Sequence, residues 1–141
     1  MRMAARRLPS YWLPLVAAVL LTACTPIPEA MPGAPIDEKL LALSELADEQ
    51  STAGDGEMAF LMRYTLLRYA VEHQDELRQV DGSERNSTQS LLLATHKGLS
   101  SMPEGSFVEE GALFSDGREL GPSPDALLEE LKWFFADVTP E

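Results

Sequence analysis

The only cysteine of the 141-residue sequence, Cys24, stands directly after Leu21, Thr22 and Ala23 at the end of an apolar stretch. A single thiol forms no disulfide within its own chain, and it cannot supply the cysteine ligands of a structural zinc site. The small side chains of Thr22 and Ala23 fit the narrow subsites of a signal peptidase. The chemistry that this pattern favours is cleavage of the peptide bond between Ala23 and Cys24.

The residues before Cys24 divide as a secretory signal does. Three arginines stand among the first seven residues, and an apolar run over 11–23 follows them. At 1.5 Å per residue, about 13 helical residues extend about 20 Å, which is shorter than the roughly 30 Å hydrocarbon core of a bilayer. We therefore predict a signal peptide over residues 1–23 rather than a membrane-spanning helix.

The run Leu21-Thr22-Ala23-Cys24 resembles the lipobox of bacterial lipoproteins. The resemblance implies that the leader is removed and that Cys24 becomes the first residue, acylated with chains such as palmitate. Two or three acyl chains anchor a protein stably to a membrane. Thr25 replaces the aspartate that retains many such lipoproteins in the inner membrane. The resemblance therefore implies the periplasmic face of the outer membrane in a Gram-negative cell envelope.

The acidic composition limits the partners of the protein. The full sequence has a formal net charge of −12, and removal of the three leader arginines leaves eight basic residues against 23 acidic ones, a charge of −15. No basic stripe is visible, so we expect no binding to nucleic acid. Because an anionic membrane surface repels such a chain, attachment to the membrane depends on the lipid at Cys24.

Two histidines and two adjacent carboxylate pairs are the remaining candidates for catalysis. His73 and His96 fall on separate predicted helices without metal-ligand spacing, so we expect surface or boundary positions for both. Glu109-Glu110 falls in a predicted loop. Glu129-Glu130 falls on a helix, where adjacent side chains point about 100° apart and do not converge on one glycosidic bond. We predict no catalytic residue, no metal and no cofactor.

The elements that position these residues begin after a proline-rich segment. Residues 25–35 contain four prolines and a glycine, a composition that excludes a helix or a central strand. Extended at about 3.1 Å per residue, they reach roughly 30 Å. We predict that the lipidated cysteine and a tether occupy 24–35 and that a helical domain occupies 36–141.

Apolar residues at helical spacing predict four helices, over 37–50, 57–80, 87–101 and 123–138. In the longest, Phe60, Tyr64 and Leu67 form one stripe, which we expect to be the centre of the core. In the last, Ser123 suits the N-cap and Pro124 the first helical position. We therefore predict an all-α fold, a small bundle of about four helices.

A long loop or a minor hairpin is expected before the last helix, over 103–122. Leu113-Phe114-Ser115 and Arg118-Glu119-Leu120 flank the dipeptide Asp116-Gly117, which is favoured in hairpin turns.

The aromatic residues suggest a surface for a partner. Trp133 points away from the apolar stripe of the last predicted helix, and Phe107 and Phe114 fall in the region before it. Exposed aromatic side chains mark protein-binding surfaces. The alternative is that the aromatic side chains on two faces of the last helix are buried in the core. We hypothesise a lipid-anchored, non-enzymatic periplasmic protein that binds another envelope protein as an assembly or accessory factor. The alternatives are a carrier of an apolar ligand such as a lipid, between the second and fourth helices, and an envelope-acting enzyme.

Overall fold

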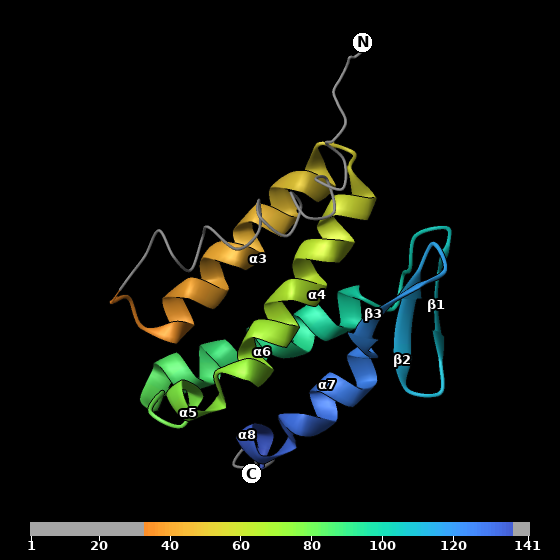
Figure 1. Cartoon of the computed structure of the whole chain (residues 1–141). Helices are drawn as coiled ribbons and strands as arrows, with labels where there is room; N and C mark the ends of the chain where they lie inside the picture. Colours follow the sequence, from red (N-terminus) through yellow and green to blue (C-terminus); the bar gives the residue numbers. More distant parts are fainter. Residues whose placement is uncertain (1–32, 137–141) are drawn as a thin grey trace. The chain divides into compact units, whose positions relative to one another are not determined.

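A computed structural model of the chain describes residues 33–136 (Figure 1). Its helices are α3 (Ile36–Thr52), α4 (Gly56–Glu72), α5 (Gln74–Leu77), α6 (Gly82–Gly98), α7 (Pro124–Glu130) and α8 (Lys132–Phe135). Its strands are β1 (Ser106–Glu109), β2 (Ala112–Ser115) and β3 (Arg118–Pro122). All of these elements belong to one unit that begins at Pro35.

Several predictions concern residues outside the described range. They are the signal peptide over 1–23, cleavage between Ala23 and Cys24, lipidation of Cys24, and residues 24–32 of the tether predicted over 24–35. Within the described residues, no helix has both the length and the apolar character that spanning a bilayer requires.

The core of the unit lies among the apolar faces of the helices. α3 and α4 lie side by side as a helical hairpin, and α6 packs against both (Figure 1). The predicted central stripe is confirmed, because Phe60, Tyr64 and Leu67 of α4 are all buried. The largest fully buried side chains come from α3, α4, α5, α6, β2, α8 and two connecting positions, and they are Leu40, Leu43, Leu66, Leu67, Leu77, Leu92, Leu99, Leu113, Leu131 and Phe134.

The prediction of an all-α fold is wrong, because the segment before α7 forms a three-stranded antiparallel sheet in the order β1-β2-β3. The strands have only four or five residues, and two-residue turns join them. Asp116-Gly117 joins β2 to β3, as its turn chemistry indicates. Glu110-Gly111 joins β1 to β2, although Glu110 must adopt a φ of 52° that glutamate rarely takes. Because Glu110-Gly111 is a weaker turn signal than Asp116-Gly117, the sequence does not predict β1.

Two of the predicted helices are interrupted. The segment over 57–80 breaks at His73, whose backbone angles are φ −124° and ψ 42°, and the last segment breaks at Leu131. Neither break contains a proline or a glycine, the residues that signal an interruption. The cap of α7 is as predicted, because the Ser123 hydroxyl accepts a hydrogen bond from the Ala126 N–H at 3.1 Å.

Side chains of α4 hold the β3 edge of the sheet against the helices. The Tyr64 hydroxyl donates a hydrogen bond to the Pro122 carbonyl at 2.5 Å, and Arg68 donates to the Leu120 carbonyl at 2.9 Å. Gly121 between them has a φ of 150°, and a Cβ there would lie 2.8 Å from the Tyr64 hydroxyl. Only glycine permits this close approach, so β3 is fixed by residues far apart in the sequence.

Two polar residues of α6 anchor the C-terminal helix in a similar way. Gln89, which is buried, donates to the Phe134 carbonyl at 2.7 Å, and Arg85 donates to the same carbonyl at 3.1 Å. The Arg85 guanidinium also lies 4.5 Å from the centroid of the Phe134 ring. These contacts bond a carbonyl in α8, the last helix of the described residues, and carbonyls at a helix end need partners from outside the helix.

Candidate interaction surface

The structure brings together two of the three aromatic residues predicted to bind a partner. Phe107 of β1 is the cross-strand neighbour of Phe114 of β2. Their rings stack with centroids 5.1 Å apart and an angle of 7° between the planes. Phe107 is 45 % exposed, and Phe114 is partly buried beneath it. The pair therefore presents a flat apolar patch on one face of the sheet.

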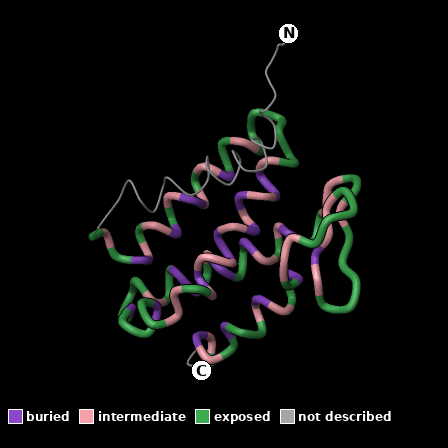
Figure 2. The backbone as a smooth tube through the Cα atoms, viewed as in Figure 1, coloured by how far each residue is buried: buried purple, intermediate pink, exposed green. Residues whose placement is uncertain are grey.

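The other face of the sheet is turned toward the core. Val108 pairs with Leu113, which is fully buried, and alternate residues of a strand point to opposite faces. Val108 nevertheless remains 43 % exposed, because β1 is the outer strand. Figure 2 shows most of β1 and its turn as exposed, in contrast to the buried segments of α4. β1 thus exposes a large apolar side chain on each of its faces.

The segment that carries the apolar patch has an excess of exposed acidic residues. Six charged residues of the segment 104–119 are all exposed, and five of them are acidic: Glu104, Glu109, Glu110, Asp116 and Glu119, against Arg118. An apolar centre within a charged rim is the usual anatomy of a protein-binding surface. The sign of this rim favours a basic partner.

Trp133 lies elsewhere, against α5. Its indole N–H donates a hydrogen bond to the Gln74 side chain at 2.6 Å, and the Arg78 guanidinium lies 4.9 Å from the ring centroid. α8 follows the end of α7 that is farther from the sheet (Figure 1). The interruption at Leu131 changes the direction in which Trp133 points, and no sequence signal marks it. Trp133 is therefore separate from the surface formed by Phe107 and Phe114.

The two histidines make contacts within the unit. The imidazole Nε2 of His96 lies 2.7 Å from a carboxylate oxygen of Asp125, which links the last turn of α6 to the first turn of α7. His73 stacks on Tyr69 with ring centroids 3.9 Å apart. Among the described residues, no group of three or more histidine, cysteine or acidic side chains is arranged to hold a metal.

The predicted carboxylate pairs lie on the surface. Glu109 ends β1 and Glu110 occupies its turn, whereas Glu129 and Glu130 end α7, and all four are exposed. Glu129 lies 3.5 Å from the Lys132 ammonium one turn further along. The two pairs therefore lie on separate elements and have no common position for a substrate.

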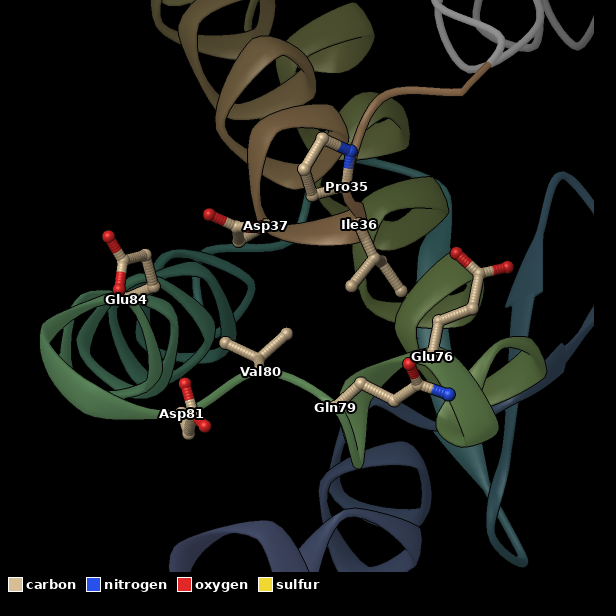
Figure 3. Close-up of a pocket in the computed structure, with 8 residues that line it drawn as sticks. All are labelled: Pro35, Ile36, Asp37, Glu76, Gln79, Val80, Asp81 and Glu84. Carbon is tan, nitrogen blue, oxygen red and sulfur yellow. The ribbon is translucent and has the colours of Figure 1, made fainter.

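A hollow of about 380 Å³ lies between the first turn of α3 and the segment joining α5 to α6 (Figure 3). Ile36 and Val80 point into it, and carboxylates from four segments surround it: Asp37, Glu76, Asp81 and Glu84. An adjoining hollow of about 250 Å³ is lined by Leu40, Leu41 and Leu91. Both lie against α3, whereas the carrier hypothesis expects a cavity between α4 and the last helices.

Comparisons of the chain with protein-family models, with curated proteins and with solved structures find no match. No function is therefore inferred from similarity to a known protein, and mixed helix-and-sheet domains of this size serve many functions. The surface with the most specific geometry among the described residues is the sheet face that carries Phe107 and Phe114.

Proposed function

We propose that this protein is a lipid-anchored, non-enzymatic periplasmic protein that binds another envelope protein through the outer face of β1 and β2. The observation that carries the proposal is the stacked pair of Phe107 and Phe114 on an outer strand. Aromatic side chains supply a large share of binding energy in protein interfaces because they bury much area at little conformational cost.

The position of the domain relative to the membrane follows from the leader. We infer that lipidation of Cys24 anchors the chain to the outer membrane and that the proline-rich residues after it serve as a tether. The domain can then meet a partner in the periplasm without leaving its anchor. This arrangement suits an assembly or accessory factor that stays at the membrane while its partner is built or inserted.

The proposed contact surface excludes Trp133. Its indole N–H and its ring are both engaged by residues of α5 and the segment after it, so its replacement by alanine perturbs the domain itself. Among the described residues, Phe107 makes one ring contact, with Phe114, and it remains nearly half exposed. The aromatic pair can therefore be altered with less effect on folding.

The anchor is tested by metabolic labelling with radioactive palmitate in a Gram-negative host. We expect label in the wild-type protein, none in Cys24→Ala, and recovery of the wild-type protein with the outer membrane after density fractionation. A labelled Cys24→Ala protein, or a wild-type protein in the soluble periplasm, contradicts this part of the proposal.

The contact surface is tested by photocrosslinking in intact cells of the natural host. A photoreactive phenylalanine analogue replaces Phe107 in one variant and Leu93 of α6 in the matched control, because Leu93 is 46 % exposed. We expect one discrete protein adduct from position 107, its loss on Phe114→Ala, and no such adduct from position 93. Equal adducts from both positions, or none from 107, contradict the proposed surface.

A further inference from the structure

We propose that the free edge of β1 binds an extended, basic segment of the partner by strand addition, with Val108 at the centre of the contact. In this mode a partner segment continues the sheet, and hydrogen bonds between the two backbones supply affinity. The inference rests on the proposed function, because it concerns the same surface. It adds the conformation of the bound segment, its charge and the backbone groups that hold it.

The hydrogen-bond pattern of the sheet identifies these backbone groups. Directly beyond the ladder, the Asp116 N–H donates to the Gly105 carbonyl at 3.0 Å. Hydrogen-bonded and non-hydrogen-bonded pairs alternate in an antiparallel ladder, so Phe107 forms a bonded pair with Phe114, and Val108 does not bond its neighbour Leu113. The N–H and C=O of Val108 therefore point away from β2, toward the outer edge.

Ser106 faces the same edge with one backbone group free for a partner strand. Its N–H donates to the Pro103 carbonyl at 3.1 Å, and by the same alternation its C=O points outward. An added strand thus meets one donor, from Val108, and two acceptors, from Val108 and Ser106. Together these three groups are enough to fix the register of an extended segment.

The β1 edge lacks three of the features that keep a sheet edge from pairing, because it carries no lysine, no proline and no bulge. It is a short strand that ends in a glutamate, so the charge that limits its pairing is negative. β1 reads Ser-Phe-Val-Glu, and among the described strands it pairs with β2 alone. The irregularity in the sheet lies between β2 and β3, away from this edge. Among residues 33–136, the outer edge of β1 therefore has no strand paired with it.

The charge of the residues near β1 indicates which kind of segment binds at its edge. Five exposed acidic residues and one arginine surround β1 within the segment 104–119. A second copy of this chain would bring the same negative charges against them, which is unfavourable for pairing. An extended segment with apolar residues on the face of Val108 and lysine or arginine on the face of Glu109 and Glu119 matches these charges. The occupant is therefore a basic segment of another protein.

Two substitutions of Val108 distinguish the contribution of its backbone N–H to binding from that of its side chain. Val108→Pro removes the outward N–H but no hydrogen bond to β2, and proline is tolerated on an edge strand where its nitrogen faces solvent. Val108→Thr is the matched control, because it keeps the N–H and a β-branched side chain of similar size. Unfolding in urea checks that both variants retain the fold.

The probe is a short synthetic peptide in which valine and lysine alternate, added to the isotope-labelled full chain in detergent. We expect shifts of amide resonances in β1, slowed exchange of the Val108 amide, and weaker binding at high salt. Val108→Thr should bind as the wild type does, and Val108→Pro about tenfold more weakly. The peptide with glutamate in place of lysine should not bind.

Three results overturn the inference. The first is that the lysine peptide shifts no resonance of β1. The second is that Val108→Pro binds this peptide with the same affinity as the wild type. The third is that the Val108 amide is protected before any peptide is added, which means that this chain or a second copy already covers the edge. Adducts from position 107 in cells, together with any of these results, leave the proposed function standing without strand addition. Peptide binding without such adducts contradicts the proposed function instead.

Discussion

The two edges of the small sheet differ in how they are covered. At the β3 edge, Tyr64 and Arg68 bond the carbonyls of Pro122 and Leu120, and Gly121 allows their close approach. At the β1 edge, Phe107 and Val108 are nearly half exposed, and no other described strand pairs with β1. The inner edge therefore fixes the sheet to the helices, and we propose that the outer edge serves recognition.

The largest effect on stability is expected at the β3 edge from Gly121→Ala. The new Cβ would lie 2.8 Å from the Tyr64 hydroxyl and 3.1 Å from an Arg68 nitrogen, and the φ of 150° is itself unfavourable for alanine. We expect a loss of about 3 kcal/mol in the free energy of unfolding, measured in urea. Gly117→Ala is the control, because φ is 81° there but nothing lies within 4 Å of its Cβ. A loss no larger than in this control contradicts the close packing at β3.

The second effect is a dependence of stability on pH. Burial raises the pKa of Tyr64 from 10.0 to about 12, against the opposing charge of Arg68. Between these values the unfolded chain releases a proton that the folded chain keeps, so ionisation favours unfolding. Stability that is fully present below pH 10 should therefore fall by about 2–3 kcal/mol as the pH rises through 12. Tyr64→Phe should remove this part of the pH dependence, and a profile that it leaves unchanged argues against a buried hydroxyl.

A smaller effect is expected from Arg68→Leu. The substitution leaves the Leu120 carbonyl without its donor and removes the ion pair with Glu72, whose groups lie 3.3 Å apart at the surface. We expect a loss of about 1 kcal/mol, most of it from the carbonyl, because exposed ion pairs contribute little. The control Glu72→Gln removes only the ion pair and should change stability by less than about 0.5 kcal/mol.

The smallest effect on stability is expected at the β1 edge. Phe107 is nearly half exposed and contacts the ring of Phe114, so Phe107→Ala should cost about 0.5–1 kcal/mol. Its effect on partner binding should be much larger, and co-purification from crosslinked envelopes measures it. If Phe107→Ala instead lowers stability as much as Gly121→Ala does, the two edges do not differ as the structure indicates.

The sequence predicted the parts of the fold that depend on local patterns. The apolar stripe of α4 and the Ser123 cap follow from spacing and from cap chemistry, and Asp116-Gly117 marks the β2–β3 turn. β1 was missed because Glu110-Gly111 is a poor turn signal, and its stability comes from pairing with β2. The interruptions at His73 and Leu131 carry no proline or glycine, so the direction of Trp133 depends on tertiary packing.

The candidate surface was predicted only in part for the same reason. Phe107 and Phe114 were recognised as aromatic residues outside the helices, but their pairing depends on the register of β1 against β2. His96 of α6 contacts Asp125 of α7, although the two residues are 29 positions apart in the sequence. Spacing within one element does not encode such a contact. The acidic hollow near α3 is lined by residues of four segments, so local sequence patterns do not predict it either.

Hydrogen–deuterium exchange distinguishes the two edges when the protein is compared in detergent and in membranes of its natural host. We expect the β3 segment to exchange slowly in both samples, whereas the β1 segment should exchange rapidly in detergent and slowly in the membranes, where its partner is present. Val108→Pro should abolish that difference for β1. Exchange of β1 that is equally rapid in both samples, or equally slow in both, would contradict the account.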